Sequence, residues 1–383
     1  MSKKKIVILG PAFPYRGGNS LFISHLYHAL ADKFEVTLFN YKLLYPSFLF
    51  PGTTQYDQSN TALMKAPNER IINSINPFNW IYVASRINAL KPDLIVFDWW
   101  HPFFGPCHFF ISSFIQKRFK DKILFITENF VSHEGNFIDK ALTRLGLSNA
   151  SAFLCLSAKV EKELQELNHR KKVFRSELPV YDCYEMEKAD ELRIRESMDY
   201  SPEDKILLFF GYVRKYKGLD ILLKALPALA KDDPSIRILV AGEFYDEQDY
   251  YLKLISDSGH ADKVKVVNKF ISNEEVGNYY GISDLVILPY RSATQSGILN
   301  VAYGFLKPVL ITDVGGLAEF VDEDKTGVIV KPENPDEITR GVKKFFALKK
   351  ETDFTSHIRR RVGSNSFNSI SALFEEITES SHS

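Results

Sequence analysis

Short apolar runs alternate with helix-patterned segments along almost the whole chain. Because these runs are apolar at successive positions, they predict strands buried on both faces, as in a parallel sheet covered by helices. The first half has such runs at 5–10, 35–40, 93–98, 122–129 and 152–157. The second half has them at 205–211, 236–243, 263–268, 284–290, 307–313 and 326–330. The pattern predicts an α/β protein with two doubly wound halves in tandem.

A polar segment separates the two alternations. The stretch ELRIRESMDYSPED, residues 191–204, breaks the rhythm and indicates a linker or hinge region. A chain of 383 residues is also too long for one ordinary hydrophobic core. We therefore predict a first domain at 1–185, a linker at 186–204 and a second domain at 205–350. A C-terminal helix and polar tail at 351–383 are expected to pack back toward the first domain.

Composition and charge exclude several classes of protein. The 48 basic and 48 acidic residues give a formal net charge of zero, so no broad field favours nucleic acid. Three cysteines, Cys107, Cys155 and Cys183, lie far apart and favour a reducing compartment over a disulfide framework. The apolar window 97–115 is interrupted by charged residues and prolines, and the apolar start before Gly10 is too short for a signal peptide. A cytoplasmic protein is expected.

The loop after the first strand of the second half carries a cluster of positive charge. The stretch GYVRKYKGLD places Arg214, Lys215 and Lys217 between two glycines, directly after an apolar run. Open parallel sheets bind ligands at the carboxyl ends of their strands. Arginine offers a planar fork and lysine a compact charge, so the pair suits a diphosphate. A solvated basic turn explains this loop equally well when it is taken alone.

A later segment, ATQSGILNVAYGFLKPV, predicts a helix with an exposed N-terminus. Thr294 and Ser296 are suitable N-cap residues, and Gly297 leaves backbone amides bare for an anion. An ordinary capped helix is the alternative interpretation. The stretch DVGGLAEFV repeats the arrangement, with Glu319 on the helix that follows.

A pair of glycines precedes the first helix of the chain. Gly17 and Gly18 let the backbone approach a ligand closely, although a simple strand-to-helix turn would also use them. The anion-binding loops are all expected at the carboxyl edges of their sheets, on both sides of a presumed cleft. That arrangement favours a reaction with two substrates.

The order of these motifs resembles that of the retaining, nucleotide-sugar-dependent glycosyltransferases of the large family-four group. The resemblance implies the GT-B fold, in which two Rossmann-like domains face a central cleft. It is strongest from Lys205 to Pro335, and its carriers are FFGYVRKYKGLDILLKAL, LVAGE, DLVILPY, QSGILNVAYGFLKPVLITDVGGLAEFV and TGVIVKPENPDEI. It further implies that the first domain binds the acceptor and the second domain binds the donor.

The resemblance assigns roles to single positions. Arg214 and Lys217 match the pair that holds the donor diphosphate, and we expect them to be catalytic. The expected donor-binding residues are Gly17, Gly18, Gln295, Ser296, Gly297 and Glu319. One departure concerns two glutamates that the family commonly places seven residues apart at this helix. Here those positions fall at Ala293 or Thr294 and at Val301, which leaves the contacts to ribose and donor sugar open.

The acceptor side is expected in the first half. The loops after the third and fourth apolar runs carry the candidates His101, Glu128, Asn129, His133 and Glu134. Related enzymes often place a histidine in such loops, so His133 is the catalytic candidate and His101 the second choice. A structural hydrogen bond is the alternative for either ring.

We therefore expect transfer of a sugar from a nucleoside diphosphate to a hydroxyl of a glycan or lipid-linked acceptor, with retention, in cell-surface polysaccharide or glycolipid synthesis. Preorganised cations can stabilise the leaving group without a metal, and the nine histidines lack metal-ligand spacing, so no cofactor is expected. The Phe- and Trp-rich loops of the first half suggest peripheral contact with the inner face of a membrane. A nucleotide-sugar epimerase and a non-catalytic sugar-nucleotide-binding subunit are the alternatives.

Overall fold

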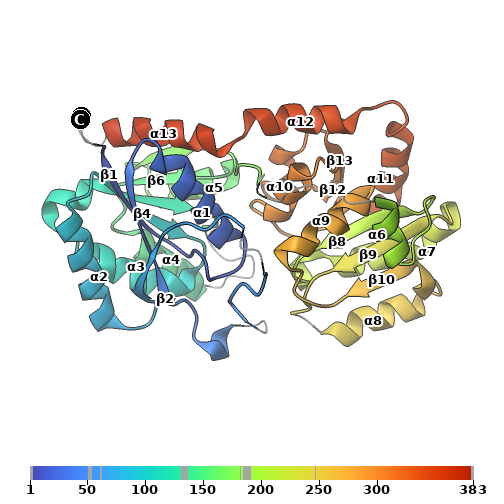
Figure 1. Ribbon diagram of the computed structural model, residues 1–383, viewed down its shortest axis with the longest axis horizontal. Helices are drawn as coiled ribbons and strands as arrows, with labels where there is room; N and C mark the ends of the chain where they lie inside the picture. The colour runs from blue at the N-terminus through green and yellow to red at the C-terminus, as the bar shows by residue number, and fades with distance from the viewer. Residues whose placement is uncertain are drawn as a thin grey trace. The chain divides into compact units, whose positions relative to one another are not determined.

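The predicted alternation of strands and helices is present in the computed structural model (Figure 1). The structure describes residues 3–50, 54–60, 63–130, 137–181, 183, 191–245 and 247–380. The chain divides into two units, which are treated separately below. The first comprises Met1–Asp57, Met64–Leu178 and Ser366–Ser383, and the second comprises Gln58–Leu63 and Pro179–Asn365.

The first unit is built on a seven-stranded parallel sheet with the order β3-β2-β1-β4-β5-β6-β7. Its strands are β1 (Lys5–Leu9), β2 (Glu35–Leu43), β3 (Glu69–Asn73), β4 (Leu94–Trp99), β5 (Ile123–Thr127), β6 (Ala152–Cys155) and β7 (Lys172–Arg175). Its helices are α1 (Gly18–Ala31), α2 (Pro77–Leu90), α3 (Gly105–Ser113), α4 (Phe137–Leu147), α5 (Ala158–Leu167) and α13 (Phe367–Ser380), with 3₁₀ turns η1 (Ser47–Leu49), η2 (Pro102–Phe104) and η3 (Lys117–Lys122).

Helices cover both faces of this sheet, which explains why its central strands are continuously apolar. All six residues of β4, LIVFDW, are buried. Phe97 on β4 stacks on Phe125 of β5 with ring centroids 4.8 Å apart, near the centre of the core. Helix α13 packs along α1, where the ring of Phe367 stacks on the ring of His25 with centroids 4.7 Å apart. The last helix of the chain is therefore part of the first unit.

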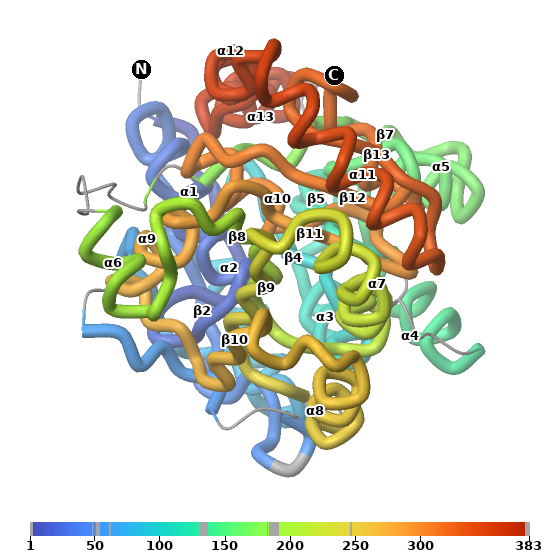
Figure 2. Tube along the Cα trace, turned by 90° about the vertical axis from the view of Figure 1, so that its right-hand side faces the viewer, coloured from blue at the N-terminus to red at the C-terminus, as the bar shows by residue number. Residues whose placement is uncertain are grey.

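The second unit has a six-stranded parallel sheet with the order β10-β9-β8-β11-β12-β13, which can be followed across Figure 2. Its strands are β8 (Lys205–Phe210), β9 (Ile236–Ala241), β10 (Val264–Val267), β11 (Leu285–Leu288), β12 (Val309–Thr312) and β13 (Gly327–Val330). Its helices are α6 (Glu191–Ser197), α7 (Leu219–Asp232), α8 (Gln248–Asp257), α9 (Asn273–Ile282), α10 (Gly297–Gly304), α11 (Pro335–Leu348) and α12 (Phe354–Ser364), with 3₁₀ turns η4 (Lys215–Lys217), η5 (Ala261–Lys263) and η6 (Leu317–Phe320).

The segment that the sequence indicated as a linker contains, from residue 191 onward, a helix anchored in the second unit. Arg195 on α6 is 6% exposed and donates hydrogen bonds to the carbonyls of Asp204 (2.8 Å) and Ile282 (3.0 Å). Its Nε also pairs with Glu191 at 3.0 Å. These contacts fix residues 191–204 to α9 and to the start of β8, because a buried guanidinium must satisfy its donors.

Both sheets reverse their strand order at one point, between β1 and β4 in the first unit and between β8 and β11 in the second. At such a point the loops leaving the two strands run to opposite faces of the sheet, and their divergence opens a crevice at the carboxyl ends. Each unit therefore has one favoured place for a ligand.

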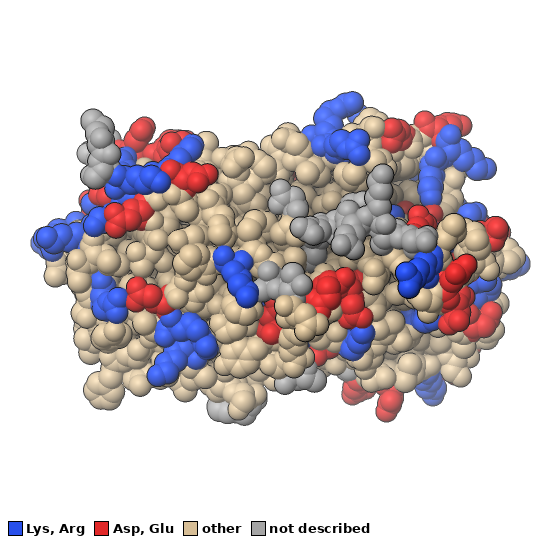
Figure 3. Space-filling view, in the orientation of Figure 1, with Lys and Arg blue, Asp and Glu red and all other residues tan. Residues whose placement is uncertain are grey.

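The described residues include no helix that is long and apolar enough to cross a bilayer. On the face shown in Figure 3, lysines and arginines lie interspersed with aspartates and glutamates, in keeping with the zero net charge of the sequence.

Candidate active site

The loop between β8 and α7 folds so that one of its three cations is buried. After Gly211, at φ +93°, the chain makes the turn η4 and leaves it through Gly218, at φ +69°. A Cβ at Gly218 would collide with the carbonyl oxygen of Pro289, so only glycine fits there. Lys217 is 7% exposed, whereas Lys215 points to solvent.

The buried ammonium of Lys217 has no counterion among the described residues. Burial, together with the nearby charge of Arg214, lowers the pKa of Lys217 to about 8. Each cation lies over an aromatic ring, Lys217 Nζ at 5.9 Å from the centroid of Tyr290 and Arg214 Cζ at 5.2 Å from that of Tyr245. An unpaired buried charge costs free energy. The loop is thus arranged to receive an anion.

Arg291 and Asp220 hold this loop in place, although neither was predicted from the sequence. The two guanidinium NH groups of Arg291 each donate to a different carboxylate oxygen of Asp220 at 2.8 Å. One NH group also donates to the carbonyl of Lys215, and the Arg291 amide donates to the carbonyl of Tyr216, both at 2.7 Å. Burial opposes ionisation of Asp220, but Arg291 and Lys224 outweigh it and lower its pKa. An arginine directly after an apolar run was the only local signal.

The N-terminus of α10 lies against the same cation. A Cβ at Gly211 would be 3.0 Å from Ile298 Cδ1 and 3.3 Å from Lys217 Nζ, so the ammonium and the first turn of α10 meet there. Ser296 caps the helix by accepting a hydrogen bond from the Leu299 amide (3.3 Å). The Gln295 side-chain oxygen is buried and has no hydrogen-bond partner in the described structure.

A third loop joins this arrangement from β12. The amide of Gly316 donates to the carbonyl of Ala293 at 3.2 Å, which fixes the Gly-Gly turn to the segment before α10. Glu319 follows in the 3₁₀ turn η6 rather than in an α-helix, and its side chain is exposed. The structure therefore brings together Arg214, Lys217, Gln295, Ser296 and the start of α10 at the β8/β11 switch point, with Glu319 farther along the neighbouring loop.

In the first unit, Gly17 and Gly18 stand at the carboxyl end of β1, where α1 begins. Gly17 has φ +108° and ψ 171°, a conformation that essentially only glycine adopts. A Cβ at either glycine would meet no atom within 4 Å. Asn40 shapes the loop before them, accepting from the Ala12 amide (3.2 Å) and donating to the Ala12 carbonyl (2.9 Å). This side of the α1 N-terminus is open to a ligand.

The two glycines allow a matched test of that approach. We expect Gly17→Ala to lower the free energy of unfolding by about 1–3 kcal/mol because of backbone strain. Gly18→Ala should leave it unchanged within about 0.5 kcal/mol, yet reduce the transfer activity that the sequence predicts about 10-fold by displacing a bound ligand. Urea unfolding and an activity assay measure the two effects. Gly363→Ala on α12, where a Cβ also meets no neighbour, is the control, and equal activity of Gly18→Ala and this control would contradict the assignment.

Two carboxylates are buried at the switch point of the first sheet. Asp98 is the penultimate residue of β4 and is fully buried. Glu128 follows β5, and its amide donates to the Trp99 carbonyl at 2.9 Å. Both Asp98 oxygens and one Glu128 oxygen lack partners in the described structure. Burial raises the pKa of Glu128 to about 8, although the Asn19 amide acts in the opposite direction. Burial and the neighbouring charge of Glu128 raise the pKa of Asp98. Glu128 was predicted from the sequence, whereas Asp98, an acid at the end of an otherwise apolar run, was not.

The remaining acceptor-side candidates have different outcomes. His101 Nδ1 accepts a hydrogen bond from the Phe103 amide at 3.2 Å and thereby caps η2, which favours the structural interpretation of this ring. Asn129 is half-buried, next to Glu128. His133 and Glu134 lie outside the described residues.

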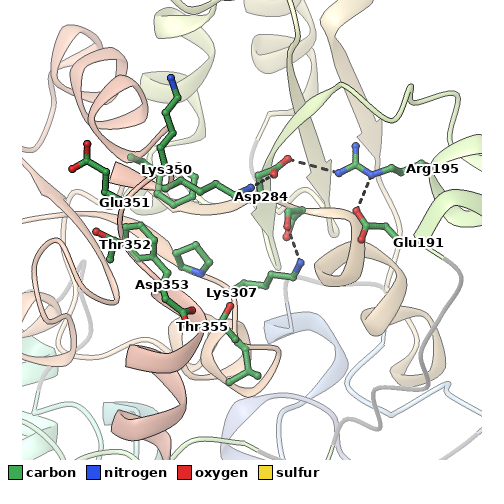
Figure 4. A pocket seen from close by; sticks show the side chains of 15 residues that line it. Glu191, Arg195, Asp284, Lys307, Lys350, Glu351, Thr352, Asp353 and Thr355 are labelled. Carbon is green, nitrogen blue, oxygen red and sulfur yellow. Dashed lines mark hydrogen bonds and ion pairs between the residues drawn. The ribbon is translucent and has the colours of Figure 1, made fainter. Parts of the chain in front are cut away.

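A pocket of about 630 Å³ in the second unit lies at the opposite edge of the sheet (Figure 4). It is bordered by Asp284, directly before β11, and by Lys307, shortly before β12. Asp284 is paired with Arg195 at 3.8 Å and with Lys349 at 2.6 Å, and Lys307 donates to the Ser283 carbonyl at 2.9 Å. These contacts give the pocket a structural role at the edge of the sheet away from the cation loop.

Comparison with known proteins agrees with this geometry. Residues 190–362 match the family model described as glycosyl transferases group 1. The match falls within the second unit. No group of three or more His, Cys, Asp or Glu side chains that could hold a metal ion occurs in the described part of the chain.

Curated proteins match parts of this chain at low identity. The lipopolysaccharide 1,2-N-acetylglucosaminetransferase of Salmonella typhimurium is 25% identical over 193 residues, which cover 48% of this chain and 50% of that protein. The matches to the curated relatives span only 33% to 50% of their lengths.

Solved structures resemble the chain over nearly its full length. Sucrose-phosphate synthase from Thermosynechococcus elongatus has a TM-score of 0.76 at 16% identity, covering 99% of both chains. Anabaena HepE in complex with UDP-glucose has a TM-score of 0.75 at 16% identity, covering 98% of this chain and 99% of that one. These likenesses establish the fold, and the expected GT-B architecture of two Rossmann-like domains is confirmed.

Proposed function

We propose that the protein transfers a sugar from a nucleoside-diphosphate donor to a hydroxyl acceptor, with retention of configuration and without a metal. The observation that carries the proposal is the buried ammonium of Lys217 beside Arg214, which has no counterion in the part of the chain that the structure describes. It lies at the switch point of the unit that matches the group 1 glycosyltransferase model. The UDP-glucose complex of the Anabaena neighbour supports a nucleotide-sugar donor. The lipopolysaccharide-directed relative supports a role in cell-surface glycan or glycolipid synthesis.

In this proposal the loops of the second unit act on the leaving group. As the glycosidic bond breaks, negative charge develops on the diphosphate, and preorganised donors stabilise that charge without reorganising. Lys217 and Arg214 provide fixed positive charge, and the amides at the start of α10 provide hydrogen bonds. Arg291 acts indirectly, since it positions the cation loop through Asp220 and the carbonyl of Lys215.

The proposal predicts that recognition depends on the diphosphate. A nucleotide sugar at 100 times its dissociation constant should stabilise the protein by about 2.7 kcal/mol, seen as a rise in melting temperature. Among UDP- and GDP-sugars, at least one should produce this rise, and the matching nucleoside without phosphates should not. Equal stabilisation by the nucleoside, or no stabilisation by any nucleotide sugar, would contradict the proposed site.

Transfer itself must be separated from binding alone, because the two expected glutamates are replaced at Ala293 or Thr294 and at Val301. The stabilising nucleotide sugar should be hydrolysed slowly by the protein, or transferred when an acceptor extract is added. Release of the nucleoside diphosphate is the measurement. Stabilisation without any release would favour the non-catalytic binding subunit, and interconversion of the donor sugar would favour an epimerase.

A further inference from the structure

The first unit carries a group of exposed apolar side chains on two neighbouring helices. Thirteen large apolar side chains are well exposed in the described part of the chain, and six of them lie between residues 75 and 114. These six, here called the apolar patch, expose 41% to 85% of their surface and are Ile75, Phe78, Ile81, Tyr82, Phe110 and Phe114. Clusters of this kind on soluble proteins mark surfaces that contact something else.

The outer face of α2 contributes one stripe of the patch. Phe78, Ile81 and Tyr82 are spaced by three and four residues, so they share one side of the helix. Phe78 is 85% exposed, and the only charged residue in the whole helix is Arg86. A surface helix normally turns polar side chains toward water. The outer side of α2 is therefore unusual for a surface that faces only water.

Helix α3 holds the second stripe in a fixed position beside the first. The ring of Phe110 stacks on Trp80 of α2, with centroids 5.5 Å apart and planes inclined by 15°. At the other end, the Asn88 amide donates to the Phe114 carbonyl (3.2 Å) and its oxygen accepts from the Gln116 amide (2.9 Å). The patch is thus a preformed surface on two packed helices.

Positive charge without acidic partners borders the patch. Lys91 follows α2, and Lys117 and Arg118 follow α3; all three are exposed, and within the described structure none pairs with a carboxylate. Between residues 70 and 120 the only acidic residues are Asp93, which contacts Lys122 at 3.7 Å, and the fully buried Asp98. The exposed Glu69 lies beside α2, but its charge is paired with Arg86 at 2.8 Å. An apolar face bordered by unpaired cations is complementary to anionic lipid headgroups over acyl chains.

We propose that the apolar patch and its bordering cations dock the first unit onto an anionic lipid bilayer. Helix α2 would lie flat in the interface, with Phe78 and Ile81 reaching the acyl boundary and Tyr82 at headgroup level. This surface differs from the Phe- and Trp-rich loops that the sequence suggested. In the loop after β4, Phe104 is fully buried and packs in the core.

Vesicle sedimentation tests the proposal without reference to enzymatic activity. The full chain should sediment with vesicles of equal parts phosphatidylcholine and phosphatidylglycerol and much less with phosphatidylcholine alone. The double variant Phe78→Ser, Ile81→Ser should lower the partition coefficient about 10-fold or more, because the exposed side chains supply the buried apolar area. The double variant Lys117→Glu, Arg118→Glu should lower the partition coefficient by at least about fivefold for each charge. Added salt should likewise lower the partition coefficient of the wild type.

A control at a second exposed apolar pair separates docking through the apolar patch from nonspecific hydrophobic binding. Tyr250→Ser with Leu252→Ser on α8, side chains 44% and 40% exposed, should leave sedimentation unchanged. Circular dichroism and the melting temperature should be unaltered in every variant, since only exposed side chains change. The proposal would be overturned if the control variant lowered sedimentation as much as Phe78→Ser, Ile81→Ser does. It would also be overturned if the wild type bound neither vesicle type, for example because it self-associates through the patch.

Discussion

Replacing Lys217 by methionine is expected to lower the rate of sugar transfer about 100-fold while leaving the fold at least as stable as the wild type. The rate falls because the variant loses a preorganised charge at the leaving diphosphate. Stability does not fall because the wild type carries a buried ammonium without a counterion among the described residues, and methionine fills similar space without that cost. The measurements are initial rates of nucleotide release and urea unfolding.

The neighbouring Lys215→Met is the matched control, since it removes an exposed cation from the same loop. It should keep activity within about threefold and stability within about 0.5 kcal/mol. A Lys217→Met protein that is as active as this control would rule out the assigned role.

The pH dependence of stability gives a second readout on Lys217. Its pKa is lowered from the ordinary 10.5 to about 8 in the folded protein, so between these pH values the unfolded chain binds more protons. Stability from this group should therefore rise as pH increases through that window, and the rise should be missing in Lys217→Met. Binding of the diphosphate should weaken over the same window, because the ammonium loses its charge.

Replacing Asp220 by alanine is expected to lower the free energy of unfolding by about 3 kcal/mol. The change leaves the partly buried Arg291 without the carboxylate that accepts two of its hydrogen bonds. It also releases the cation loop, so transfer should fall about 10- to 100-fold through misplacement of Lys217. Urea unfolding and nucleotide release measure the two losses.

Lys224→Met is the control for Asp220→Ala, because Lys224 contacts the same carboxylate at 3.2 Å from a half-exposed position. It should cost no more than about 0.5 kcal/mol, as exposed pairs usually do. If Asp220→Ala were no more harmful than Lys224→Met, the buried pair would not be the anchor described above. Because the pKa of Asp220 is lowered, its stabilisation is present above the ordinary carboxyl range and is lost as pH falls below it.

The strands and their parallel arrangement could be read from the sequence because burial on both faces demands continuous apolar runs. The run LIVFDW, for example, became a fully buried central strand. The linker could not be read in the same way. Its residues 191–204 are polar, yet Arg195 is buried there, and the carbonyl of the distant Ile282 accepts one of its hydrogen bonds.

By itself, the sequence determined the fold class and the position of Arg214 and Lys217 at a strand end, because both follow from local order along the chain. Only the tertiary structure decided that Lys217 is buried while Lys215 is exposed, and that Arg291 anchors the loop through a residue 71 positions away. It also decided that Asp98 and Glu128 are buried with carboxylate oxygens that have no partner among the described residues. Burial and pairing depend on neighbours that the sheet brings together from distant segments. No local pattern of residues records which neighbours those are.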